Sequence, residues 1–241
     1  MRAVRRLVVV LVVLAGAALV LDRVGVWLAN RAVADQVAQG LAAHEVASAP
    51  PEVSVTGFPF LTQLVAGRYG SVDVILRNVE RDGLRMPLVR LTATGVDAPL
   101  KAVVDNSGPI HAERLTGSAV IGYGSVVELA GREGLQLVGG VEGSLRMRLP
   151  IEVLGVRVVL IGRAEVTVDE PGLLVELVEF DVEAPVDLPP GADPLIERAA
   201  RSLSLRVELP PLPYGLAVDA VRVEPTGIVV TVSASDVLLA D

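Results

Sequence analysis

The first thirty residues hold a basic cluster followed by a long apolar run. Three arginines lie within the first six residues, the apolar segment Leu7–Leu21 follows them, and Asp22 and Arg23 end it. A basic segment before an apolar one is typical of an export signal. Because such arginines stay on the cytoplasmic side, we expect the chain beyond about residue 30 to be extracytoplasmic, in the periplasm or cell envelope.

Two fates are open for this segment. The run Leu7–Leu21 is shorter than the roughly 20 residues that span a bilayer, but Val24–Ala29, with Trp27 as an interfacial aromatic residue, could extend it. Ala15-Gly16-Ala17 is a small-x-small site for a signal peptidase. Residues 1–30 are therefore expected to be a cleaved signal peptide or a retained membrane anchor, and residues 31–241 a single domain.

A helix is predicted over Asn30–Val46. Val33, Val37 and Leu41 recur every four residues on one face, and Ala49-Pro50-Pro51 ends the helical pattern. The apolar stripe must pack against the following strands or against lipid.

From Val53 onward the apolar residues alternate with polar ones, as in strands with one buried face. We expect an α+β fold with a long N-terminal helix, a large antiparallel sheet and a second short helix near residue 200, begun by Asp193 and Pro194. The predicted strands are Val53–Thr56, Val72–Leu76, Leu84–Thr94, Thr116–Tyr123, Leu135–Val141, Gly143–Val153, Arg157–Val168, Leu173–Glu183, Leu205–Leu209, Leu216–Val223 and Ile228–Ser233, with helical turns at Ser125–Gly131.

Composition narrows the possible functions. The chain is 51% hydrophobic but only 3% aromatic, so its core must be aliphatic, and it has no cysteine for a disulfide or a lipid-modified N-terminus. The net charge is −8, and it becomes −11 without the four arginines and one aspartate up to Arg23. A domain this acidic is a poor candidate for nucleic-acid binding.

Catalytic and metal-binding motifs are missing from the sequence. Two histidines without cysteine do not make a zinc site of the usual ligands, and His44-Glu45 lacks a second histidine four residues on. There is no phosphate-binding loop and no nucleophile elbow. The carboxylates are scattered, so we expect no enzyme, no metal and no cofactor.

Two motifs resemble a known family. The segment Gly57-Phe58-Pro59-Phe60-Leu61-Thr62, followed by Gly67-Arg68-Tyr69, is similar to the actinobacterial LmeA-type family. The closing segment Leu209-Pro210-Pro211-Leu212-Pro213-Tyr214-Gly215-Leu216 agrees with it. The resemblance covers nearly the whole chain, although residues 94–183 match only in strand rhythm.

The resemblance implies an extracytoplasmic phospholipid-binding protein beside the outer face of the cytoplasmic membrane. The family is tied to phosphatidylinositol and to the biogenesis of envelope glycolipids. Its fold is similar to tubular lipid-binding domains, in which a curved sheet wraps a long helix and leaves an apolar cavity. A cavity without aromatic residues suits flexible acyl chains.

The candidate lipid-binding residues each have a structural alternative. Val33, Val37 and Leu41 could line the cavity or simply pack on the sheet. Phe58 and Phe60, with Leu61 beside them, could form a cavity lip, a membrane-facing tip or a core plug. Arg68 and Tyr69 could hold a lipid phosphate, or be a surface arginine and a packed tyrosine.

Two rival functions remain open from the sequence. One is an anchored structural β domain that scaffolds envelope enzymes, for which Pro210–Pro213 could dock a partner as polyproline or act as a rigid link. The other is a carboxylate-based glycan hydrolase, which requires a polar cleft with two convergent carboxylates.

Overall fold

A computed structural model describes residues 2–81, 83–105, 108–140, 143–169, 172–184, 191–201, 204–209 and 211–240. The helices are α1 (Arg2–Ala43), α2 (Phe60–Ala66), α3 (Leu100–Asp105), α4 (Tyr123–Ala130) and α5 (Ala192–Arg201), with a 3-10 turn at Pro213–Gly215. The strands are β1 (Glu52–Thr56), β2 (Arg68–Arg81), β3 (Leu84–Asp97), β4 (Ile110–Ile121), β5 (Gln136–Gly139), β6 (Leu145–Val153), β7 (Val156–Asp169), β8 (Gly172–Glu183), β9 (Ser204–Glu208), β10 (Ala217–Glu224) and β11 (Gly227–Ala240).

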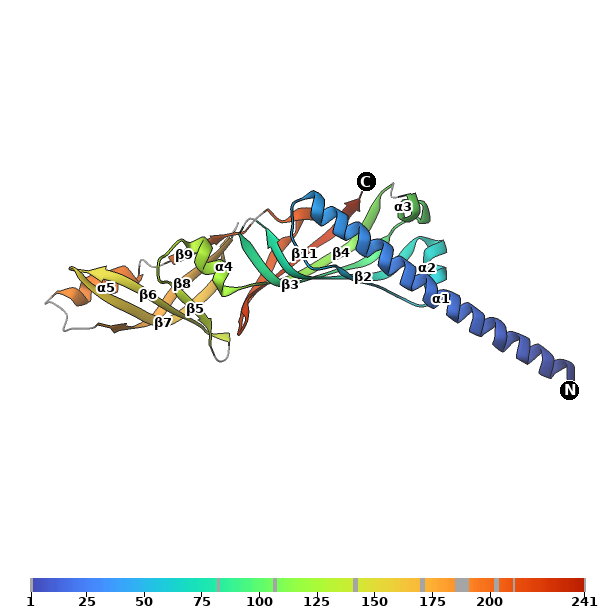
Figure 1. Ribbon diagram of the computed structural model, residues 1–241, viewed down its shortest axis with the longest axis horizontal. Coiled ribbons are helices and arrows are strands. Elements are labelled where there is room, and N and C mark those ends of the chain that lie inside the picture. Colours follow the sequence, from blue (N-terminus) through green and yellow to red (C-terminus); the bar gives the residue numbers. More distant parts are fainter. Residues whose placement is uncertain are drawn as a thin grey trace.

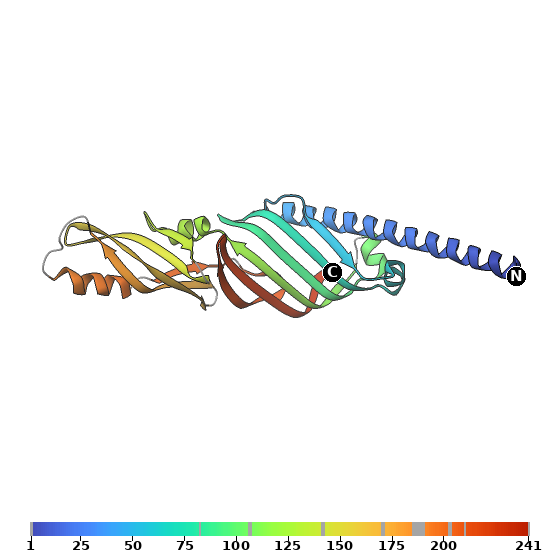
Figure 2. The same ribbon diagram turned by 90° about the horizontal axis from the view of Figure 1, so that it is seen from below.

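The strands form two antiparallel sheets that lie end to end in an elongated molecule (Figure 1). Sheet A has the order β1-β2-β3-β4-β11-β10, and sheet B has the order β5-β6-β7-β8-β9. Helix α1 runs along sheet A near the β1 edge, and its N-terminal half projects beyond the sheet into open space (Figures 1 and 2). The chain leaves sheet A after β4, builds sheet B and returns through β10 and β11.

The two faces of sheet A differ in chemistry because the side chains alternate along each strand. One row of paired residues across five strands is apolar: Val53, Val74, Leu91, Gly117 and Val232. The next row is polar: Ser54, Asp73, Thr92, Thr116 and Ser233. The sheet therefore has an aliphatic face and a hydrophilic face.

Buried side chains form two separate cores. The larger core fills sheet B and its junction with sheet A, and it includes Leu145, Leu160, Leu173, Ile121 and Ile228. The smaller core lies where α1 and α2 meet the other end of sheet A, and it includes Val55, Phe60, Tyr69, Ala93, Val96, Ala112, Leu115 and Val237. Helix α1 contributes Val26 and Ala29 to the smaller core.

The N-terminal helix is longer at its start and shorter at its end than the pattern predicts. It is one continuous element from Arg2, and it ends at Ala43 instead of Val46. Glu45 adopts a left-handed conformation with φ 57°, and the Val46 N–H donates to the Leu41 carbonyl at 2.9 Å. This six-to-one hydrogen bond is the Schellman arrangement that stops a helix, so termination comes before the prolines.

The predicted α+β class, the long N-terminal helix and the short helix near residue 200 are confirmed. The strands divide into two sheets where the pattern alone indicated one. Helices α2 and α3 were not predicted, and α5 begins at Ala192, which places Asp193 inside its first turn. Within the predicted turns and linkers, residues 170–171, 185–190 and Pro210 lie outside the described residues.

Candidate functional site

Two polar side chains of α1 attach the helix to the domain. The Leu61 backbone N–H donates to Asp22 Oδ1 at 3.0 Å, and the Val55 backbone N–H donates to Asn30 Oδ1 at 2.8 Å. The first bond caps α2, whose own N-cap residue is Pro59 and makes no side-chain cap bond. These bonds fix which face of α1 is turned toward sheet A.

The predicted stripe lies on this same face. Val33, Val37 and Leu41 continue the helical spacing from Asp22 and Asn30, and all three are half-buried, whereas Ala38 is exposed. Beyond them, the Ala47 N–H donates to the Glu80 carbonyl at 3.1 Å, so the end of α1 is held against the far end of β2. The stripe thus lies above the aliphatic face of sheet A.

Half-exposed aliphatic residues on sheet A lie in the same region. Within the described parts of the chain, neither core contains them or the stripe of α1. Together these eight side chains, all partly exposed, form what we call the aliphatic lining: Val33, Val37 and Leu41 on α1, and Val53, Val74, Val89, Leu91 and Ala119 on sheet A. The lining lies between the two filled cores.

The lining is suited to hydrocarbon and to little else. None of its eight side chains can donate or accept a hydrogen bond, so it offers only dispersion contacts and shelter from water. Gly117 lies in the middle of the same face, where an added Cβ would come within 2.9 Å of Leu91 and Val232. Because Gly117 has no side chain, the space above the middle of the lining stays open.

The aromatic motif after β1 places its members differently. Phe58 is 64% exposed, Phe60 is only 2% exposed, and Leu61 is 36% exposed beside α1. The Phe60 ring packs 6.2 Å from the Tyr69 ring, measured between centroids. Phe60 is therefore a core residue, as the plug interpretation expected, whereas Phe58 is available at the surface.

Arg68 and Tyr69 are neighbours in β2 but have different surroundings. The Arg68 side chain is 80% exposed, and its Nε lies 3.8 Å from Asp97 Oδ2. Tyr69 is part of the smaller core, and its hydroxyl has no hydrogen-bond partner among the described residues. Burial raises the pKa of Tyr69. Both side chains nevertheless border the hollow described next, so their binding of a lipid phosphate stays a prediction.

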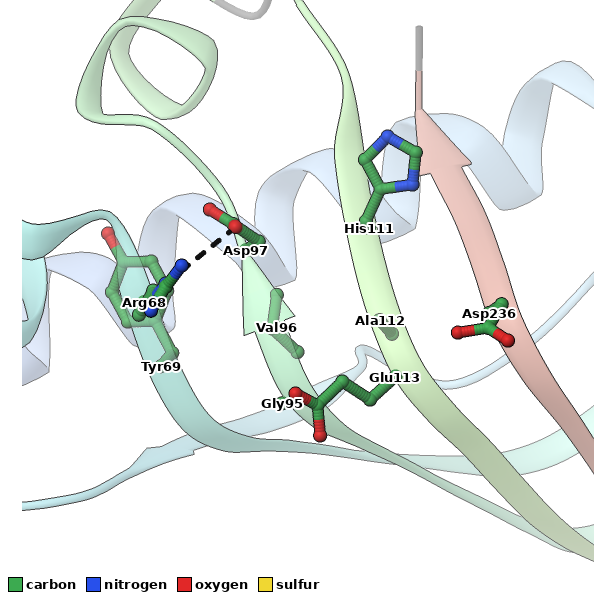
Figure 3. Close-up of a pocket in the computed structure, with 9 residues that line it drawn as sticks. All are labelled: Arg68, Tyr69, Gly95, Val96, Asp97, His111, Ala112, Glu113 and Asp236. Carbon is green, nitrogen blue, oxygen red and sulfur yellow. Dashed lines mark ion pairs between the residues drawn. The ribbon is translucent and has the colours of Figure 1, made fainter.

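A hollow of about 330 Å³ lies at this end of sheet A (Figure 3). Its lining is mixed and strongly charged, with Arg68, Asp97, His111, Glu113 and Asp236 around it. Glu113 occupies the space above Gly95, whose φ of +60° and lack of Cβ accommodate that carboxylate. This hollow is too polar for acyl chains.

A second hollow, of about 470 Å³, lies where β10 and β7 bring the two sheets together. Val166, Val221 and Val223 give it an apolar part, and Arg163, Glu165 and Arg222 give it a charged part. Arg163 is already paired with Glu179 at 2.6 Å. Across the described residues, no group of three or more His, Cys, Asp or Glu side chains could hold a metal ion.

The sheet residues of the lining and the role of Asp22 were missed by sequence reasoning. The alternation that predicts strands does contain Val53, Val74 and Leu91, but it does not say which of them meet α1. Asp22 appears in the sequence as the end of an apolar run, and its hydrogen bond to Leu61 spans 39 residues.

Comparison with known proteins bears on both the helix and the domain. Helix α1 contains one stretch, Val10–Ala43, that is long and apolar enough to cross a membrane, and it fits a signal peptide or a membrane anchor. A family model described as LmeA-like phospholipid-binding matches residues 20–233. Searches of curated proteins and of solved structures found no match.

Proposed function

The chain belongs to the LmeA-like phospholipid-binding family, and from this we propose that its aliphatic lining holds the acyl chains of a phospholipid. The proposal rests on one observation: eight half-exposed aliphatic residues belong to neither hydrophobic core. In a well-packed protein interior, neighbouring side chains cover such residues completely. The part of the lining that protein leaves uncovered is suited to a flexible hydrocarbon ligand.

The energetics favour exchange with a bilayer. Each CH₂ group that leaves water gains about 0.8 kcal/mol, but a lipid that moves from a bilayer to an apolar lining exchanges one hydrocarbon environment for another. The net free energy is therefore small, which permits both uptake and release. We propose that the protein holds or shuttles lipid of the phosphatidylinositol type in the biogenesis of envelope glycolipids.

We place this activity at the outer face of the cytoplasmic membrane. The arginines before the apolar half of α1 support that orientation. An alkaline phosphatase fusion to residue 241 tests it, because that reporter needs disulfides that form only after export. The fusion should be active, and Leu14→Arg in the apolar run should abolish the activity. An inactive wild-type fusion would contradict the placement.

The lipid site is tested by a matched pair of substitutions. Val37→Asp puts a carboxylate in the lining, whereas Val178→Asp makes the same change at an exposed position of sheet B. Native mass spectrometry with lipid extraction on the purified full chain should show phospholipid on the wild type and on Val178→Asp, but much less on Val37→Asp. Circular dichroism checks that each variant is folded.

Two results would overturn the site. Equal lipid content in folded Val37→Asp and Val178→Asp would remove the lining from the proposal. A wild-type chain that carries no lipid and refuses added phospholipid would instead favour the structural scaffold. Since the family is a phospholipid-binding one, we propose no catalytic step, and the scattered carboxylates are interpreted as a solvated surface.

A further inference from the structure

Helix α2 has an apolar face that is wider than the part buried in the smaller core. Phe60 and Leu64 pack in the smaller core. Leu61 lies beside Gly25 of α1 and is still 36% exposed, and Val65 is 86% exposed. Phe58, just before the helix, is also exposed. A helix at a water-exposed surface normally carries polar residues outward, so this face of α2 requires a different explanation.

Two polar side chains of α2 make local hydrogen bonds, although Gln63 Nε2 is buried without a partner among the described residues. The Thr62 hydroxyl donates to the Pro59 carbonyl at 2.8 Å, and the Gly70 N–H donates to Gln63 Oε1 at 3.0 Å. Such local bonds satisfy polar groups without water. The outward face of α2 therefore presents hydrocarbon and few groups that need hydration.

This face lies beside the point where α1 leaves the domain. Leu61 is bonded to Asp22, and the Phe60 ring lies so close to α1 that a Cβ on Gly25 would come within 3.1 Å of it. On the N-terminal side of Asp22, residues Val10–Leu21 are all exposed. Figure 1 shows the bare helix continuing outward from the end of the sheet that carries α2 and α3.

The length of the apolar run in α1 indicates that α2 lies close to the bilayer. Leu7–Leu21 is 15 residues and so about 22 Å long, less than the hydrocarbon core of about 30 Å. Continuation to Leu28 supplies the missing length but includes Asp22 and Arg23. Asp22 is 2% exposed because α2 covers it, and Arg23 lies over the Phe58 ring, 5.4 Å from its centroid. Both charged residues are thus accommodated near the membrane.

We propose that α2 and the preceding loop form a second membrane contact, immersed in the interface of the bilayer that α1 enters. Its apolar residues, which we call the docking patch, are Phe58, Leu61, Val65 and Leu100. Leu100 belongs to it because the Ala98 N–H donates to the Gly67 carbonyl at 2.8 Å, which holds the start of α3 against the end of α2. This inference rests on the membrane placement proposed above.

The charges beside the docking patch agree with a lipid surface. Arg23 and Lys101 are exposed next to it, whereas Asp22 is buried and Asp97 is paired with Arg68. The remainder of the domain is acidic and would be repelled by anionic headgroups. This end can therefore approach the membrane while the rest of the molecule stays away.

The docking patch also gives the lipid site a place to exchange its ligand. The lining of sheet A begins near Val53, two residues before Val55, which is bonded to Asn30 two helical turns from Asp22. A lipid that leaves the bilayer beside α2 can thus reach the lining along one face of α1. Val65→Asp should slow lipid transfer from vesicles several-fold and leave the amount bound at equilibrium unchanged.

The absence of cysteine makes a direct test possible. Single-cysteine variants Leu14→Cys, Val65→Cys and Val178→Cys are labelled with an environment-sensitive fluorophore, and the full chain is reconstituted into phosphatidylcholine vesicles with or without nitroxide-labelled acyl chains. All three positions are exposed. The nitroxide should quench the labels at positions 14 and 65 several-fold more strongly than the label at position 178.

Each other outcome would contradict either the docking patch or the membrane placement. Quenching at position 14 with none at position 65 would remove the docking patch but keep the anchor. No quenching at position 14 would remove the membrane placement, and the patch with it. The label at position 65 could also be shielded from water without being quenched, and become exposed when the protein is diluted. That result would assign the docking patch to contacts between copies of the chain. Lipid content, measured separately, tests the lining itself.

Discussion

The carboxylate of Asp22 offers the sharpest test of how α1 is attached. It is 2% exposed, and its Oδ1 accepts the Leu61 N–H at 3.0 Å. Its Oδ2 has no hydrogen-bond partner among the described residues and lies 3.9 Å from Arg23 Nη2. Because the Arg23 side chain is 60% exposed, that ion pair contributes at most about 1 kcal/mol, so the hydrogen bond is the main favourable term.

Two substitutions separate the hydrogen bond from the charge. Asp22→Ala removes the acceptor and leaves the Leu61 N–H unpaired, which costs about 2 kcal/mol. In a chain of this size that loss lowers Tm by about 4–8 °C. Asp22→Asn keeps a carbonyl oxygen at the same place and removes a poorly paired buried charge, so its stability should stay within about 1 kcal/mol of the wild type.

The assay is thermal unfolding of the full chain in detergent, followed by circular dichroism, together with amide hydrogen exchange at Leu61. Asp22→Ala should exchange faster at Leu61 and unfold at lower temperature, and Asp22→Asn should resemble the wild type in both. An Asp22→Ala variant with unchanged Tm and unchanged protection of the Leu61 amide would refute the capping role.

Three further predictions concern other residues. Phe60→Ala should cost about 3–5 kcal/mol of stability because it empties the smaller core, whereas Phe58→Ala should leave the urea midpoint nearly unchanged; similar losses for both would contradict the burial of Phe60. Burial raises the pKa of Tyr69, so as pH rises past about 10 this tyrosine ionises first in the unfolded chain, and the free energy of unfolding falls. Tyr69→Phe should reduce this alkaline loss of stability in urea titrations at high pH. An unchanged loss would exclude Tyr69 as its source. The hydrogen-bonded guanidinium of Arg77 lowers the pKa of Glu52, so Arg77→Gln should raise it in an NMR titration, and an unmoved pKa would show that the pair does not persist in solution.

The elements with regular periodicity could be predicted from the sequence. Alternation in Val72–Leu76 and Leu173–Glu183 indicates strands because each has one buried face, and the four-residue spacing of Val33, Val37 and Leu41 indicates a helix stripe. The division into two sheets could not be predicted. It depends on β11 returning to pair with β4, and local patterns do not encode such a long-range choice.

Helix α2 could not be predicted for a related reason. Its seven residues make only about two turns, too few for the spacing of Phe60, Leu61, Leu64 and Val65 to establish a helical period. Its first turn is capped by Asp22 from a distant part of the chain and not by its own N-cap residue. A helix this short, stabilised by tertiary contacts, leaves too little periodicity in the sequence to be recognised.

The continuity of α1 has a consequence for processing. A cut after Ala17 would release the chain at Ala18, and the first side chain of α1 seen to bond to the domain is Asp22, one helical turn later. Cleavage and retention therefore leave the same folded body, because all the described hydrogen bonds of α1 to the domain survive the cut. A single gene product could then supply both a stationary lipid acceptor and a freely diffusing carrier, in proportions set by peptidase efficiency and not by refolding.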